Sequence, residues 1–275
     1  MNPVAIGSLR IGRGEPPALI AGPCVIETYE NLIETARRAK ELAGQFGFGY
    51  VLKSSFEKAN RTSRNAYRGP GLEAGLEMLR RVKCELDVSV LTDIHAPEQA
   101  DAVAKIADCL QIPAFLCRQT ELVEAAARTG LPINIKKGQF LAPAAMAYAI
   151  EKARAAGRGG VLLTERGTFF GYGDLVVDMR SLMQMAEMGV PVIFDATHSS
   201  QKPAGLVSTG GDRKYIAPLA GAAAATGAID GIFLEVHPDP DKALSDASTQ
   251  LPIENLPNLL KRLQDIFQSA RPQQP

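Results

Sequence analysis

The chain has 275 residues, 46% of them hydrophobic, and its 30 basic side chains balance 30 acidic ones. This supports one large core and a single domain over residues 1–275, since α/β barrels often reach this length. Zero net charge argues against a general nucleic-acid or membrane-surface binder, and no stretch approaches the roughly 18 apolar residues of a membrane span. With no visible secretory signal and no Cys-x-x-Cys spacing, we expect a cytoplasmic protein.

The hydrophobic pattern predicts a short hairpin followed by eight strand–helix units. Residues 4–14 alternate weakly in polarity and end in Gly-Arg-Gly, which is typical of a hairpin. The predicted strands are 18–21, 49–52, 88–92, 109–112, 132–135, 161–164, 190–194 and 231–234. The predicted helices lie near 29–46, 71–85, 97–106, 119–128, 143–156, 178–187, 213–226 and 255–269.

Near-continuous apolar strands that alternate with helices favour a parallel sheet covered by helices. Eight units close a (β/α)8 TIM barrel, and an open doubly wound sheet is the alternative. No Gly-x-Gly-x-x-Gly follows the first strand, which weakens the dinucleotide-binding form of that alternative. Residues 270–275 are expected to form a disordered tail.

The connection from Lys53 to Gly71 is long and basic. It carries five cationic side chains against one acid, together with four serine or threonine hydroxyls and two amides. Strand-to-helix connections usually have two to about six residues, and much longer ones are functional or disordered. This stretch alone is compatible with a solvated basic loop and with a cradle for a multiply anionic ligand.

Polar side chains also follow the predicted strands, at the end of a barrel where active sites lie. They are Cys24, Lys53, Asp93, His95, Gln111, Lys136, Lys137, Glu165, Arg166, Asp195, His198, Glu235 and His237. Burying so many charges without partners would be costly, so their clustering favours a functional site. The cationic members suit a ligand that carries carboxylate and phosphate groups.

One subset combines a sulfur, an imidazole and two carboxylates, and its members are Cys24, His198, Glu235 and Asp246. Such a mixed set suits a divalent metal such as Zn²⁺, Fe²⁺ or Mn²⁺. The four residues come from distant segments, so spacing alone does not establish a site. A lone cysteine after a strand is more often a core residue than a ligand.

The chain also carries longer motifs, namely Ala21-Gly-Pro-Cys-Val-Ile-Glu27, Lys53-Ser-Ser-Phe-Glu-Lys-Ala-Asn-Arg61, Tyr67-Arg-Gly-Pro-Gly71, Gln111-Ile-Pro-Ala-Phe-Leu-Cys-Arg-Gln119, Asn134-Ile-Lys-Lys-Gly-Gln-Phe140, Thr164-Glu-Arg-Gly167, Phe194-Asp-Ala-Thr-His198, Glu235-Val-His-Pro-Asp-Pro240 and Ala243-Leu-Ser-Asp-Ala-Ser-Thr-Gln250. Together these motifs resemble those of the 3-deoxy-D-manno-octulosonate 8-phosphate synthases. The resemblance implies a (β/α)8 barrel, usually a homotetramer. It implies a transferase that condenses phosphoenolpyruvate with D-arabinose 5-phosphate and releases phosphate, in the pathway to the lipopolysaccharide sugar Kdo.

The resemblance also implies roles for individual residues. The phosphoenolpyruvate contacts are Lys53, Ser55 and Lys58 for the carboxylate, and Lys136, Arg166 and the backbone near Ala114 for the phosphate. The arabinose phosphate contacts are Asn60, Arg61 and a neighbouring subunit's Arg118, with Thr62 in the place of a common serine. Asp93 and Gln111 line the floor of the site.

Cys24 and the run from Ser245 to Ser248 resemble the metal-dependent branch of the family, whereas the other branch has asparagine after the first strand. The resemblance therefore implies that the four mixed donors hold a divalent metal. The predicted catalytic residues are His198, Asp246, Lys136 and Asn60, with the general base left open. Residues 201–213 are predicted to form a mobile lid.

Three alternatives remain open. The sister enzyme makes 3-deoxy-D-arabino-heptulosonate 7-phosphate from erythrose 4-phosphate, and it reads Lys-Pro-Arg where this chain has Lys58-Ala-Asn-Arg61. A Schiff-base aldolase would use Lys136 as its nucleophile. A barrel that senses phosphate or metal without catalysis is the third alternative.

Overall fold

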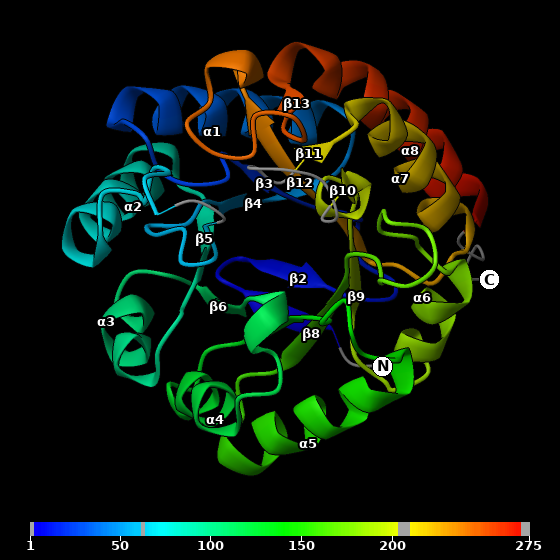
Figure 1. Cartoon of the computed structure of the whole chain (residues 1–275). Coiled ribbons are helices and arrows are strands. Elements are labelled where there is room, and N and C mark those ends of the chain that lie inside the picture. The colour runs from blue at the N-terminus through cyan, green and yellow to red at the C-terminus, as the bar shows by residue number, and fades with distance from the viewer. Residues whose placement is uncertain (1–2, 62–63, 203–209, 271–275) are drawn as a thin grey trace.

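The computed structural model describes residues 3–61, 64–202 and 210–270, and in these residues eight parallel strands close into a barrel inside a ring of helices (Figure 1). The barrel strands are β3 (Ala18–Gly22), β4 (Gly49–Lys53), β5 (Ser89–Asp93), β6 (Cys109–Ile112), β7 (Ile133–Lys136), β8 (Val161–Glu165), β9 (Val192–Asp195) and β12 (Gly231–His237). The barrel is closed because β12 pairs with both β3 and β9. The predicted TIM barrel is confirmed, and the open sheet is wrong.

The helices bury one apolar face each against the outside of the barrel. They are α1 (Tyr29–Gln45), α2 (Leu72–Leu86), α3 (Ala100–Ala104), α4 (Thr120–Arg128), α5 (Met146–Ala156), α6 (Met179–Ala186), α7 (Ile216–Ala225) and α8 (Leu256–Ala270). In α1, buried Leu32, Ala36 and Ala39 follow helical spacing. The predicted helix near 97–106 is shorter than expected, because a 3-10 turn at Pro97–Gln99 precedes α3.

The predicted hairpin is present and closes the amino end of the barrel. Its strands β1 (Val4–Ile6) and β2 (Leu9–Ile11) pair antiparallel, and β2 lies inside the ring of strands in Figure 1. Buried Ile6 and Ile11 pack with Val51 and Phe233 in the barrel interior. The interior of the barrel at its amino end is therefore filled with apolar side chains.

Two short strand pairs extend this carboxyl end. Strands β10 (Gln201–Lys202) and β11 (Gly210–Gly211) pair antiparallel, and β13 (Leu251–Pro252) runs beside β12. The predicted lid at 201–213 includes 203–209, which lie outside the described residues, as do 271–275 of the predicted tail. Ala270 belongs to α8 rather than to a tail. None of the described helices is long and apolar enough to cross a membrane.

Candidate active site

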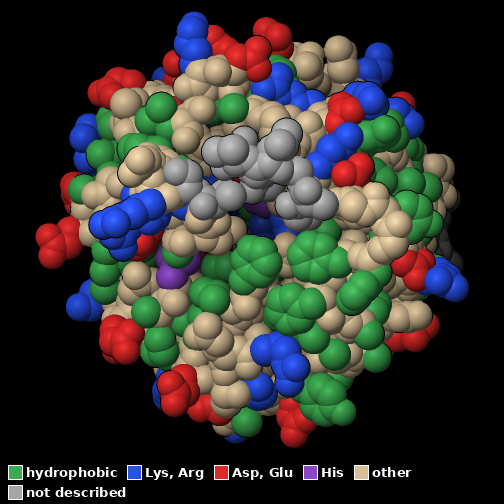
Figure 2. Space-filling model, in the orientation of Figure 1, with side chains coloured by type: hydrophobic (Ala, Val, Ile, Leu, Met, Phe, Trp, Pro, Cys, Tyr) green, Lys and Arg blue, Asp and Glu red, His purple; other side chains and the backbone are tan. Residues whose placement is uncertain are grey.

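A pocket of about 760 Å³ opens at the carboxyl end of the barrel. Figure 2 shows basic and histidine side chains within the hollow at the centre of this face. The predicted residues that line the pocket are Cys24, Lys53, Ser55, Lys58, Asn60, Arg61, Asp93, His95, Gln111, Ala114, Lys136, Arg166, His198, Glu235 and Asp246. Arg118 is exposed and is absent from this lining, and Thr62 lies outside the described residues.

Lys53 is a buried cation at the floor of the pocket. Its Nζ lies 3.1 Å from Asp93 Oδ2 and 3.8 Å from Glu235 Oε1, and it donates to the Cys24 carbonyl at 3.2 Å. Burial opposes its charge, but these two carboxylates hold the pKa of Lys53 above its ordinary value. In the same way Lys53 holds the pKa of buried Asp93 below its usual range. The pair is thus ionised at neutral pH.

A ladder of side-chain hydrogen bonds continues from Asp93 across the neighbouring strands. Gln111 Nε2 donates to Asp93 Oδ1 (2.7 Å), Asn134 Nδ2 donates to Gln111 Oε1 (2.9 Å), and Thr164 Oγ1 donates to Asn134 Oδ1 (2.8 Å). All four side chains are buried. Each amide group donates one hydrogen bond through its nitrogen and accepts one through its oxygen. The ladder therefore fixes the orientation of the Asp93 carboxylate, which faces Lys53.

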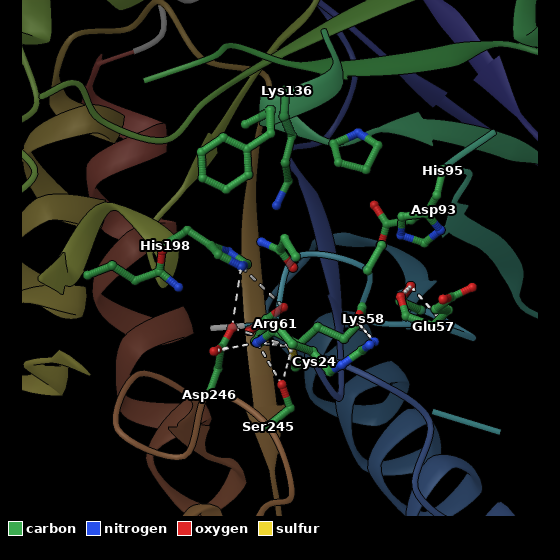
Figure 3. Close-up of a pocket in the computed structure, with 18 of the residues that line it drawn as sticks. Cys24, Glu57, Lys58, Arg61, Asp93, His95, Lys136, His198, Ser245 and Asp246 are labelled. Carbon is green, nitrogen blue, oxygen red and sulfur yellow. Dashed lines mark hydrogen bonds and ion pairs between the residues drawn. The ribbon is translucent and has the colours of Figure 1, made fainter. Parts of the chain in front are cut away.

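Lys58 joins the basic connection to the mixed donor set (Figure 3). Its Nζ donates to Ser245 Oγ at 2.6 Å, lies 3.7 Å from Cys24 Sγ and forms an ion pair with Asp246. Cys24 Sγ lies 3.5 Å from Asp246 Oδ2. Burial, followed by the charge of Glu235, raises the pKa of the Cys24 thiol well above its ordinary value. The thiol is therefore neutral unless a further cation approaches it.

The four mixed donors meet on one side of the pocket. One donor atom each of Cys24, Glu235 and Asp246 lies within 4.8 Å of the others. His198 Nε2 lies 3.4 Å from Glu235 Oε1 and 3.9 Å from Asp246 Oδ2. Its Nδ1 lies 2.8 Å from Asp195 Oδ2, although the two atoms form no aligned hydrogen bond. The Nε2 edge of the ring therefore faces the two carboxylates.

Two further cations approach from the opposite strands. Lys136 Nζ lies 2.5 Å from Asp195 Oδ2 and 3.8 Å from the centre of the Phe233 ring. Arg166 is buried and donates to Gln201 Oε1 at 2.5 Å, and its burial lowers the pKa of the guanidinium. In Figure 3, Lys136 and His198 point toward the same space. These contacts fix both cations at the wall of the pocket.

The basic connection supplies the rim. Ser55 is buried, Arg61 is half-buried and Asn60 is exposed at the mouth. Arg61 Nη1 donates to the Lys58 carbonyl at 2.6 Å, while its Nε is buried without a partner. Ala114, in the turn after β6, faces the same pocket. This part of the connection thus lines the pocket instead of forming a solvated loop.

Several residues at the strand ends do not face the pocket. Lys137 and Glu165 lie behind it, Asp195 lies beneath Lys136, and His237 contacts Glu27 and Asn31. Consecutive residues of a strand face opposite sides, so not every polar residue at a strand end can reach one space.

The pocket is also lined by residues to which the sequence analysis assigned no individual role. They are Ser245, Gln201, Tyr67 and Gln139. Ser245 precedes a predicted donor and could have been found from that position. Gln201 lies in an irregular segment, where no periodicity indicates direction.

Comparisons with known proteins agree with this site. Residues 2–271 match the DAHP synthetase I family. The 2-dehydro-3-deoxyphosphooctonate aldolase of Syntrophotalea carbinolica is 52% identical over 262 residues, covering 95% of this chain and 94% of the relative. Proteins of the same name are 55% identical over 250 residues in Nitratidesulfovibrio vulgaris (90% and 91%) and 53% identical over 264 residues in Trichlorobacter lovleyi (96% and 97%). The family predicted from the motifs is confirmed: the chain belongs to the DAHP synthetase I family and, within it, to the 2-dehydro-3-deoxyphosphooctonate aldolases.

Proposed function

We propose that the chain condenses phosphoenolpyruvate with D-arabinose 5-phosphate and water, giving 3-deoxy-D-manno-octulosonate 8-phosphate and phosphate for Kdo biosynthesis. The observation that carries the proposal is the convergence of five cationic side chains from separate segments on one pocket, namely Lys53, Lys58, Arg61, Lys136 and Arg166. Two phosphorylated substrates, one of them also a carboxylate, need such a set of cations. The names of the relatives support the same reaction.

The residues of the pocket suggest how phosphoenolpyruvate binds. Lys53, Ser55 and Lys58 lie together and would hold its carboxylate, while Lys136 and Arg166 across the pocket would hold its phosphate. Asn60 and Arg61 at the mouth would meet the sugar phosphate. Holding both substrates in this way directs C3 of phosphoenolpyruvate toward the sugar aldehyde, and orientation of this kind lowers a barrier by several kcal/mol.

The proposed reaction balances in bonds and protons. C3 of phosphoenolpyruvate forms a bond to the aldehyde carbon, and the aldehyde oxygen takes one proton. Water adds its oxygen to C2 and supplies two protons, one to that aldehyde oxygen and one to the departing phosphate. Cleavage of the bond from C2 to the phosphate oxygen leaves the C2 ketone. His198 and Asp246 lie beside this space and are the proposed proton carriers.

We also propose that the chain belongs to the metal-dependent branch. The donors Cys24, His198, Glu235 and Asp246 suit Zn²⁺, Fe²⁺ or Mn²⁺, and Glu235 Oε2 is buried without a hydrogen-bond partner, as a ligand oxygen would be. Bound there, the metal would supply Lewis acidity toward the aldehyde or toward water. A thiol ligand must stay reduced, which favours a cytoplasmic location.

Phosphate release from purified protein tests the function. We expect turnover with phosphoenolpyruvate and D-arabinose 5-phosphate, and at least tenfold lower kcat/KM with erythrose 4-phosphate, because a missing polar contact costs about 1.4 kcal/mol or more. The relatives' names do not favour the erythrose alternative. Preference for erythrose 4-phosphate would overturn the assignment, and no turnover with either sugar would favour a sensing barrel.

A second copy of the chain is proposed to complete the sugar-phosphate site. Figure 2 shows hydrophobic side chains gathered beside the mouth of the pocket. In the connections that follow β6 and β8 at the carboxyl end of the barrel, Phe115 is 51% exposed, Phe170 78% and Tyr172 77%. Phe170 also has a φ of 93°, a conformation that is strained for a bulky residue. Exposed aromatic side chains are typical of protein–protein interfaces. Arg118 lies three residues from Phe115 in the same connection, so an interface there would bring Arg118 to the neighbouring copy.

Substitution of Arg118 tests this shared site. We expect Arg118→Ala to raise KM for D-arabinose 5-phosphate about tenfold or more, because a charge-assisted hydrogen bond contributes about 1.5–3 kcal/mol. KM for phosphoenolpyruvate should change little. Arg128→Ala, which removes an exposed arginine paired with Glu124, is the matched control. An unchanged sugar KM, or a monomer in sedimentation, would contradict the shared site.

A further inference from the structure

Lys137 and Glu165 form a buried charged pair directly behind two of the pocket cations. Lys136 and Lys137 are neighbours at the end of β7, and Glu165 and Arg166 are neighbours at the end of β8, the adjacent strand. Lys136 and Arg166 line the pocket, whereas Lys137 and Glu165 are only 1% and 2% exposed and do not reach it. Each member of the pair is therefore bonded through the backbone to one proposed phosphate contact.

The contacts of Lys137 tie two backbone connections together. Its Nζ lies 3.5 Å from Glu165 Oε1 and donates to the carbonyls of Gly138 (3.3 Å), Leu141 (3.3 Å) and Gly167 (3.5 Å). The first two carbonyls belong to the connection after β7, and the third belongs to the connection after β8. One ammonium group thus holds the two connections at a set separation.

The contacts of Glu165 hold the backbone of Arg166 itself. Glu165 Oε1 accepts hydrogen bonds from the backbone N–H of Arg166 (2.9 Å) and of Gly167 (2.6 Å). Its Oε2 accepts from Ser181 Oγ of α6 at 2.8 Å. The carboxylate therefore fixes the turn from which the guanidinium enters the pocket and anchors that turn to a helix.

Stability alone gives little reason for such a pair. Desolvation of two buried charges offsets most of their attraction, and well-packed apolar residues would stabilise the fold as well or better. The pair's hydrogen bonds, however, all go to α6 and to the two connections that directly follow the strand ends at Lys136 and Glu165. A pocket that binds an anion tightly needs its cations fixed before the anion arrives.

We propose that Lys137, Glu165 and Ser181 form a positioning network that sets the separation and direction of Lys136 and Arg166, and so determines the affinity for the phosphate of phosphoenolpyruvate. This inference rests on the proposed function. It makes Lys137 and Glu165 determinants of substrate binding although neither side chain touches the pocket.

Lys137→Met and Glu165→Gln test the network. Supporting residues of this kind change affinity or activity by about 10–100-fold, so we expect KM for phosphoenolpyruvate, and its Kd by calorimetry, to rise about tenfold or more. KM for D-arabinose 5-phosphate should change by no more than about twofold. Supporting residues affect the groups that they contact, and the network does not contact the rim of the pocket, where the sugar phosphate is proposed to bind. Ser181→Ala removes one hydrogen bond and should raise the phosphoenolpyruvate KM about threefold.

Lys83→Met is the matched control. Lys83 Nζ lies 2.7 Å from Asp108 Oδ1, and Asp108 Oδ2 accepts from the backbone N–H of Val90, so this pair also ties a carboxylate to a strand. It lies at the amino end of the barrel, away from the pocket. We expect Lys83→Met to lower the melting temperature while both KM values remain those of the wild type.

The outcomes separate the network from the proposed function. A wild-type protein that releases no phosphate from the two substrates counts against the function. Wild-type turnover, combined with an unchanged phosphoenolpyruvate KM in folded Glu165→Gln and Ser181→Ala, overturns the network. An equal rise of both KM values, or the same change in Lys83→Met, also overturns it, since that is the signature of general destabilisation.

Discussion

Chelation of the purified protein is expected to abolish phosphate release, and addition of Zn²⁺, Fe²⁺ or Mn²⁺ is expected to restore it. The donors Cys24, Glu235 and Asp246 lie within 4.8 Å of one another, and Glu235 Oε2 has no other partner. Lewis-acid stabilisation is worth several kcal/mol of barrier, and about 4 kcal/mol corresponds to roughly a 10³-fold loss of rate. Elemental analysis should find about one metal ion per chain before chelation, as a four-donor site implies.

Variants of the donors sharpen this expectation. Glu235→Gln and Cys24→Asn should each lower both the bound metal and the rate, because each removes an anionic or thiolate ligand. Glu57→Gln is the control: Glu57 also lines the pocket, but its carboxylate pairs with Arg68 at 2.6 Å and lies outside the donor set. Metal content in Glu57→Gln should match the wild type. Full activity in metal-free wild-type protein would refute the four-residue site.

Lys136→Met is expected to lower kcat/KM for phosphoenolpyruvate by about 10²–10³-fold, because removing one fixed group that stabilises developing charge commonly has this effect. Lys136 is buried, faces the pocket and is held by Asp195 at 2.5 Å. The substitution removes a proposed phosphate contact. It also removes the ammonium group that pairs with the buried Asp195 carboxylate. Steady-state kinetics with varied phosphoenolpyruvate measures the loss.

Two controls make the Lys136 result specific. Lys105→Met removes an exposed lysine and should leave the kinetics unchanged. Borohydride treatment in the presence of both substrates should label no lysine, because the proposed reaction forms no Schiff base. Labelling of Lys136 would establish the aldolase alternative, and wild-type kinetics in folded Lys136→Met would refute its role as a phosphate contact.

The strands and helices could be predicted from the sequence because their signals are local. The apolar run at 109–112 coincides with β6, and the other barrel strands begin within two residues of their predicted starts. The closed barrel followed from the number of units. Polar residues at the strand ends indicated the carboxyl face, since all parallel strands end on the same side.

Which of those polar residues cooperate could not be predicted from spacing. Cys24 and Asp246 are 222 positions apart, yet Sγ and Oδ2 lie 3.5 Å apart because the connection after β12 lies over the end of β3. Motif resemblance proposed this set, but only the packing of the connections placed its atoms. Ser245 and Gln201 lie in segments that the sequence analysis named, but their contact with the pocket was not predicted because irregular segments carry no periodicity.

The sequence by itself determined the barrel, its carboxyl-end pocket and, through the motifs, the family. The motif resemblance already implied that Lys136 and Arg166 contact the substrate, but only the tertiary structure showed that the equally charged Lys137 and Glu165 face away from the pocket. The physical reason is that hydrophobic periodicity reports burial but not which buried polar groups share hydrogen bonds. From the sequence, a charged residue at a strand end that contacts a ligand cannot be distinguished from one that supports the contacting residue.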